Sequence, residues 1–98
     1  MDEASTRKHV AQHADSVKRG DMDAVVADFS EQLRPHVPGL AQMLPQPVEL
    51  AEVLSAEVGE HECVALIHYS GGTGEVTIRS RWQEEGGRPV IVAAEPAA

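Results

Sequence analysis

The chain has 98 residues, a formal net charge of −8 at pH 7 and an aromatic content of 3%. Its length suits one domain, and its acidic excess would repel the phosphates of nucleic acids and the headgroups of anionic membranes, so we expect neither as a partner. No apolar run approaches the roughly 20 residues of a membrane span, and the first residues lack the apolar core of a secretion signal, so we expect a cytoplasmic protein.

The first part of the chain predicts two helices, over residues 5–19 and 22–29. Gly20 favours the left-handed conformation that ends many helices, and Asp21 is a preferred N-cap residue for the helix that follows. The apolar stripe of the first helix consists of Val10, Ala14 and Val17. The apolar stripe of the second helix consists of Met22, Val25, Val26 and Phe29.

Residues 30–47 predict a kinked or broken helix. Apolar residues recur at helical spacing through this segment, but Pro35 and Pro38 lack the backbone N–H group that a helix interior needs. We expect Pro45 and Pro47 to end the helical part of the chain.

From residue 48 the hydrophobic period changes to two, which predicts strands over residues 48–58, 62–70, 75–83 and 88–95. Short loops that contain glycine join these strands, so we expect antiparallel neighbours in a meander. The predicted fold class is therefore α+β, with N-terminal helices packed on a four-stranded antiparallel sheet.

The second predicted strand contains the most apolar stretch of the chain, from Cys63 to Tyr69. A strand without alternation is typical of one that is buried on both faces. We expect one face to meet the helices and the other to meet a second copy of the chain.

The pairing of the strands decides which side chains share a face. Pairing about a 71–74 loop places one set beneath the helices, namely Val64, Leu66, His68, Val76, Ile78, Ser80, Trp82, Val90 and Val92. The other face is then the expected homodimer interface, with the candidates Ala65, Ile67, Tyr69, Arg79, Arg81 and Ile91. A slip of one residue would exchange the two faces.

The stretch Gly-Asp-x-Asp-Ala-Val-x-x-x-Phe at residues 20–29, followed by an antiparallel meander, resembles the nuclear transport factor 2-like superfamily. This superfamily includes ketosteroid isomerases and polyketide cyclase-like proteins, and the resemblance covers residues 9–29 and 48–95. It implies one shortened domain over residues 1–98 with a cystatin-like cone fold, in which the helices lie against the concave face of a curved sheet. It also implies a pocket between these layers and dimerisation through the other sheet face.

The catalytic residues of the ketosteroid isomerases do not transfer to this chain. His13 stands where the resemblance would place their tyrosine, and the segment nearest to their catalytic aspartate, residues 35–39, contains no carboxylate. His9 and His13 have the i, i+4 spacing of helical zinc ligands, but no third ligand accompanies them. We therefore assign no catalytic residue, no metal and no cofactor.

The expected pocket would be lined by side chains of the helices and of the face assigned inward. The candidates are His13, Val17, Phe29, His36, Leu40, Met43, Leu66, His68, Ile78 and Trp82. His68 interrupts an apolar strand, and its imidazole would serve either as an acid, base or ligand donor, or as a core histidine bonded to Ser80, a helix carbonyl or water.

Two main hypotheses about function follow. The first is a homodimeric module that binds a small apolar ligand or acts as a scaffold without chemistry. The second is an isomerase- or cyclase-like enzyme that uses His13, His36 or His68; a third is a domain that pairs with a different chain. An open cavity with converging polar groups would favour the enzyme, and a filled interior would favour the module.

Overall fold

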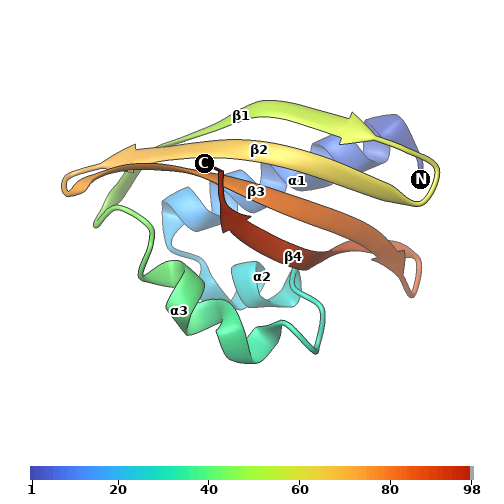
Figure 1. Ribbon diagram of the computed structural model, residues 1–98, viewed down its shortest axis with the longest axis horizontal. Helices are drawn as coiled ribbons and strands as arrows, with labels where there is room; N and C mark the ends of the chain where they lie inside the picture. Colours follow the sequence, from blue (N-terminus) through green and yellow to red (C-terminus); the bar gives the residue numbers. More distant parts are fainter. Residues whose placement is uncertain (98) are drawn as a thin grey trace.

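The computed structural model describes residues 1–97. Helix α1 (Glu3–Arg19) and the short helix α2 (Met22–Ala27) are followed by a 3₁₀ turn, η1 (Arg34–His36), and by α3 (Val37–Ala41). The strands are β1 (Val48–Val58), β2 (Glu62–Gly71), β3 (Gly74–Glu85) and β4 (Arg88–Pro96). They form one antiparallel sheet in the order β1-β2-β3-β4, with α1 behind β1 and β2 (Figure 1). This arrangement confirms the predicted α+β class and the meander.

The ends of α1 are closed by local hydrogen bonds. The backbone N–H group of Ser5 donates to the carboxylate of Asp2 at 2.7 Å, which satisfies one of the free donors of the first turn. Gly20 has a φ of 72°, and its N–H group donates to the carbonyl groups of the last turn. Asp21 caps α2 through the N–H group of Ala24. Both caps predicted between the helices are therefore confirmed.

Helix α2 ends at Ala27 rather than at residue 29 because the following residues pair with β4. The N–H group of Ile91 donates to the carbonyl of Asp28 at 2.7 Å, and the N–H group of Ser30 donates to the carbonyl of Ile91 at 2.9 Å. This short parallel bridge covers part of the β4 edge and holds the Asp28 backbone against the sheet.

The helix predicted over residues 30–47 is broken into η1 and α3, as expected. Pro35 and Pro38 each stand in the first turn of one of these pieces. The N–H group that proline lacks would have no intrahelical partner there, so each proline begins a helix at little cost.

The pairing predicted for β2 and β3 was wrong by one residue. Tyr69 lies opposite Val76, and Ile67 lies opposite Ile78. The strands continue to Gly71 and Gly74, which leaves a turn of residues 72–73 in place of the expected 71–74 loop. Because the observed loop is shorter than the predicted one, the register differs by one residue. Every side chain of β2 therefore lies on the face opposite to the predicted one.

This shift corrects the predicted dimer interface. Ala65, Ile67 and Tyr69, which were assigned to it, lie on the inner face beneath the helices, and Ile67 is only 2% exposed. They are therefore unavailable to a second copy of the chain. Arg79 and Arg81 lie on the outer face, opposite Leu66 and Val64, respectively.

The pairing predicted for β4 was also wrong. Ile91, rather than Val90, lies opposite Trp82, and the register shifts between Arg81 and Trp82. Val90 and Ile91 are both buried, so Ile91 also leaves the predicted interface.

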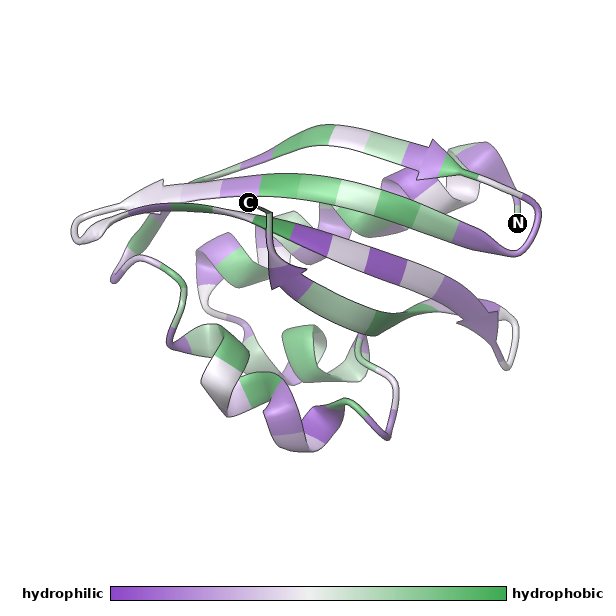
Figure 2. Cartoon of the chain, viewed as in Figure 1, coloured by the Kyte–Doolittle hydropathy of each residue, from purple (hydrophilic) through white to green (hydrophobic). Residues whose placement is uncertain are grey.

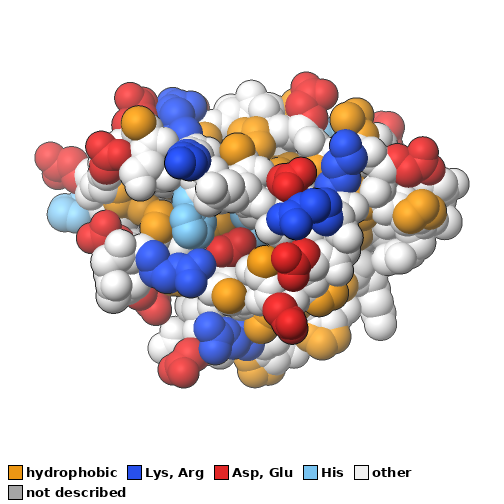
Figure 3. Space-filling model, turned by 180° about the vertical axis from the view of Figure 1, so that it is seen from behind, with side chains coloured by type: hydrophobic (Ala, Val, Ile, Leu, Met, Phe, Trp, Pro, Cys, Tyr) orange, Lys and Arg blue, Asp and Glu red, His pale blue; other side chains and the backbone are white. Residues whose placement is uncertain are grey.

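The core lies between the inner face of the sheet and the helices. Its largest fully buried side chains are Trp82, Ile67, Ile91, Val10 and Cys63. Coloured by hydropathy, the middle of β2 is almost continuously hydrophobic, whereas β3 alternates with hydrophilic residues (Figure 2). The opposite view of the molecule shows acidic and basic side chains interspersed with small apolar areas (Figure 3). Within residues 1–97, no helix has the length and apolar character needed to cross a membrane.

Candidate functional site

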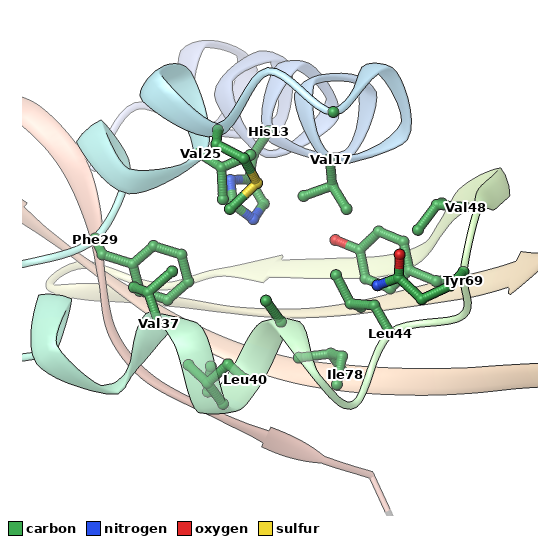
Figure 4. Close-up of a pocket in the computed structure, with 15 residues that line it drawn as sticks. His13, Val17, Val25, Phe29, Val37, Leu40, Leu44, Val48, Tyr69 and Ile78 are labelled. Carbon is green, nitrogen blue, oxygen red and sulfur yellow. The ribbon is translucent and has the colours of Figure 1, made fainter.

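A cavity of about 180 Å³ lies between the helices and the inner face of the sheet (Figure 4). Its wall is formed by His13, Val17, Gly20, Met22, Val25, Phe29, Val37, Leu40, Ala41, Leu44, Gln46, Val48, Tyr69, Ile78 and Ala94. Most of these side chains are apolar. The polar exceptions are His13, Gln46 and Tyr69, so the cavity is an apolar site with a few hydrogen-bonding groups.

The structure brings together only part of the predicted pocket. The candidates that lie in the wall are His13, Val17, Phe29, Leu40 and Ile78. Leu66 and His68 are on the outer face because of the shifted register, which corrects their assignment. His36 and Met43 are exposed and lie outside the wall, Met43 with an exposed fraction of 42%.

Trp82 also lies outside the wall, although it is fully buried. Its ring packs edge-on against the rings of His13 and His9, at centroid distances of 5.4 and 5.9 Å, respectively. Trp82 therefore supports the imidazoles from the sheet side.

Tyr69 is the main wall residue that the sequence interpretation missed, because it was assigned to the opposite face. The Tyr69 side chain is 3% exposed, and its hydroxyl group points into the cavity (Figure 4). Within residues 1–97, no hydrogen bond engages this hydroxyl group, and it is not sealed from the cavity space. Burial raises the pKa of Tyr69 above its ordinary value, so the phenol stays protonated and can donate a hydrogen bond.

A cluster of charged and polar side chains stands next to the cavity. Asp28, just after α2, receives hydrogen bonds from three residues: His13 Nδ1 lies 2.9 Å from Asp28 Oδ2, and His9 Nε2 lies 3.2 Å from Oδ1. Arg88, the first residue of β4, donates from Nη2 to Oδ1 at 2.9 Å. The cluster thus joins α1, α2 and β4 through one carboxylate.

The carboxyl group of Asp28 is ionised at neutral pH. Burial acts to raise its pKa, but the hydrogen bonds and charges of His13 and then of His9 outweigh burial and hold this pKa below its usual value. An ionised carboxylate only accepts hydrogen bonds, so Nδ1 of His13 must carry the proton that lies between the two residues. In neutral His13 the other ring nitrogen, Nε2, is then a hydrogen-bond acceptor.

His9 and His13, which have the spacing of helical zinc ligands, are therefore both hydrogen-bonded to Asp28. His13 and Asp28 are hydrogen-bonded to each other, whereas His36 lies apart on η1 and is exposed. Within residues 1–97, no group of three or more His, Cys, Asp or Glu side chains is placed to hold a metal ion. Arg88, whose side chain is 46% exposed, closes the cluster toward solvent.

His68 has local partners on the outer sheet face. Its Nδ1 lies 2.9 Å from Oγ1 of Thr77 on the neighbouring strand, and its Nε2 lies 3.8 Å from a carboxylate oxygen of Glu75. The protein hydrogen-bond partner of His68 is therefore Thr77, and not Ser80 or a helix carbonyl, which were considered together with water for a core histidine. His68 is a cross-strand surface residue, and it takes no part in the cavity.

These features define a small α+β protein with a meander sheet, helices on one sheet face and an apolar cavity between the two layers. No family model matches the sequence, and none of the curated proteins matches it. In structure the chain is similar to a SEC-C motif containing protein from Rhodopseudomonas palustris, with a TM-score of 0.63 and 16% identity. The match covers 98% of this chain and 91% of that chain, and it shows a shared fold.

Proposed function

We propose that this protein binds a small, mainly apolar molecule in the cavity beneath its sheet. The observation that carries this proposal is a pair of polar groups on buried wall residues, the Tyr69 hydroxyl and the His13 Nε2 atom, which form no hydrogen bond within residues 1–97. The third polar wall residue, Gln46, is exposed. Both atoms reach the cavity space, and a molecule that fills the cavity would cut them off from water, so it must offer them hydrogen-bond partners. The architecture remains, in our interpretation, a shortened cone of the nuclear transport factor 2-like superfamily, and helices lying over a cavity on one sheet face support this.

The size of the cavity limits the ligand. Its volume of about 180 Å³ is close to that of dry cavities of ~150 Å³ that hold benzene. We therefore expect one ring with few substituents rather than a steroid-sized molecule.

The cavity proposal is tested by titrating the protein with toluene and phenol and following two-dimensional amide NMR spectra. We expect saturable shifts of the cavity residues, and we expect Val17→Phe, which fills the cavity, to abolish them. Leu54→Phe is the matched control, because Leu54 is 51% exposed and lies outside the cavity wall. An absence of saturable binding of both probes to the unmodified protein would refute the proposal.

A second candidate function is acid–base catalysis on a small apolar substrate, and the hydrogen bond between Asp28 and His13 favours it. In such a reaction Nε2 of His13 would take a proton from the carbon next to a substrate carbonyl group. The electron pair of that C–H bond would form a C=C bond while the π electrons of the carbonyl group move to its oxygen, and the Tyr69 hydroxyl group would stabilise the resulting enolate.

The test is deuterium exchange at the α-carbons of cyclohexanone in D₂O, followed by NMR. An enzyme would exceed the exchange caused by a buffer of equal pH, and His13→Asn would remove the excess. If exchange equals that of the buffer, enolisation of this ketone is excluded and binding without chemistry is favoured.

We further propose a homodimer through the outer sheet face, made by residues other than those predicted. Val64 and Leu66 of β2 form a partly exposed apolar strip on that face, with Glu57 of β1 on one side and Arg81 of β3 on the other. A two-fold axis parallel to β2 would stack two such faces and bring β1 of each subunit over β3 of the other. Glu57 would then meet Arg81 of the partner subunit, so charge complementarity selects a second copy as the occupant.

Light scattering after size-exclusion chromatography at micromolar concentration tests this dimer. We expect Arg81→Glu to yield a monomer and the double variant Glu57→Arg with Arg81→Glu to restore the dimer. Arg34→Glu, on the exposed side of η1, is the control and should remain dimeric. A monomeric unmodified protein, or a double variant that stays monomeric while Arg81→Glu dissociates, would contradict this geometry.

A further inference from the structure

If the cavity is a ligand site, as proposed above, its two buried polar residues, His13 and Tyr69, decide the class of ligand, because the third polar wall residue, Gln46, is exposed. Three donors fix the Asp28 carboxylate on one side of His13: Nδ1 of His13 itself at 2.9 Å, His9 at 3.2 Å and Arg88 at 2.9 Å. In the neutral imidazole of His13, with its proton on Nδ1 toward this carboxylate, Nε2 presents a lone pair. The ring projects from α1 toward the cavity (Figure 4), so the cavity gains an acceptor at this point.

Tyr69 supplies the complementary donor. Its side chain comes from β2, on the sheet side of the cavity, and its hydroxyl group points inward (Figure 4). Since burial raises the pKa of this phenol, it keeps its proton at neutral pH. The cavity therefore offers one acceptor from the helix side and one donor from the sheet side.

The remainder of the wall excludes a charged ligand. Within residues 1–97, none of the wall side chains is Lys, Arg, Asp or Glu. An ion placed there would lose its hydration without gaining a counter-charge, and a carboxylate would in addition face the Nε2 lone pair. The ligand is therefore uncharged.

We propose that the ligand is a single-ring compound that carries a hydroxyl group, such as a phenol or a cyclic alcohol. The hydroxyl group donates its proton to Nε2 of His13, and the Tyr69 hydroxyl group donates to an oxygen of the ligand. A hydrocarbon of the same shape leaves both protein groups unpaired on binding. Because each buried unpaired group carries a desolvation penalty, we expect the hydroxylated ring to bind about 10- to 100-fold more tightly than the hydrocarbon.

The experiment compares phenol, toluene and benzoate, which share one ring and differ in the group attached to it. Trp82 is the sole tryptophan, so its indole N–H group gives a single signal in a proton–nitrogen NMR spectrum. This ring packs against His13 at 5.4 Å, and the signal reports binding without a label in the cavity.

Two variants remove one polar group each. His13→Asn places an amide N–H group where Nδ1 stood, which retains the bond to Asp28 but eliminates the acceptor at Nε2. Tyr69→Phe removes the hydroxyl group and keeps the ring. We expect each variant to reduce the ratio of phenol affinity to toluene affinity by about 10-fold.

The unmodified protein alone decides the outcome if a variant fails to fold. Phenol that binds at least 10-fold more tightly than toluene, with no saturable binding of benzoate, supports the hydroxyl assignment. Toluene that binds as well as phenol, or benzoate that binds more tightly than phenol, overturns it and leaves a ligand cavity of another specificity. If none of the three probes binds, both the ligand class and the proposed function of the cavity are refuted.

Discussion

Replacing Asp28 by alanine should strongly destabilise the fold. Asp28 is only 7% exposed, and its carboxylate accepts hydrogen bonds from His9, His13 and Arg88. Loss of the carboxylate leaves these donors without their partner. Removing one member of a buried charged pair costs ~3–5 kcal/mol. Arg88 and His9 are partly exposed and can turn to water, so the low end of that range, about 3 kcal/mol, is expected.

The matched control is Asp15→Ala. Asp15 also receives a short hydrogen bond from an arginine, Arg19, at 2.8 Å, but both side chains are more than half exposed. Exposed pairs of this kind contribute ~0–1 kcal/mol, so the control should change little. The contrast between the two substitutions isolates the effect of burial.

Urea titrations followed by Trp82 fluorescence would measure both free energies of unfolding, because the indole ring packs against His9 and His13. For a domain of this length, a loss of about 3 kcal/mol lowers Tm by roughly 12–24 °C. An Asp28→Ala variant that loses less than about 1 kcal/mol, or no more than the Asp15→Ala variant does, would refute the buried cluster as a main connection between the helices and β4.

Three further outcomes are expected. The pKa of Asp28 is lowered in the folded chain from about 3.8, so the contribution of this carboxylate to stability is complete above that pH and is lost as pH falls through the lower folded value. Urea titrations at several pH values should therefore show that the difference in unfolding free energy between the unmodified protein and Asp28→Ala shrinks only below about pH 4. A difference already lost at pH 6 would contradict this. Ile67→Ala should lower the free energy of unfolding by ~2–5 kcal/mol and Leu66→Ala by much less, because Ile67 is 2% exposed on the inner face. If chemical denaturation gave the reverse order, the register first predicted would be right. Gly71→Ala should destabilise the fold by roughly 1–3 kcal/mol, since the added Cβ atom would overlap the backbone carbonyl of Pro47, just before β1. In Gly39→Ala, in α3, the added Cβ atom would meet open space, so this control should be neutral or stabilising. Equal Tm values for the two variants would disprove this steric argument.

Much of the fold could be predicted from local patterns. The change of hydrophobic period near residue 48 separated helices from strands, and the strand bounds agree closely with those observed. Gly20 and Asp21 marked the junction of the first two helices because their backbone preferences act over a few residues. Such signals depend on neighbours in sequence, and the sequence displays them directly.

The candidate site could be predicted only in part. His13 and several aliphatic wall residues were identified because helical periodicity orients them. Tyr69 was assigned to the wrong face because four consecutive turn residues, including Gly71 and Gly74, permit more than one loop length. Because β2 carries apolar residues on both faces, its hydrophobic pattern fits either register equally well.

The sequence by itself determined the class of fold, the order of the elements and the caps that bound the helices, since each of these follows from interactions between near neighbours. Only the tertiary structure decided the register of the sheet and the composition of the cluster, in which Asp28 and Arg88 meet although they are separated by 60 residues. The physical reason is that closing a turn by one residue more or fewer costs little locally. The choice is made by the packing of whole strands against helices, where a slip would expose Ile67 and Tyr69 to water and bury His68.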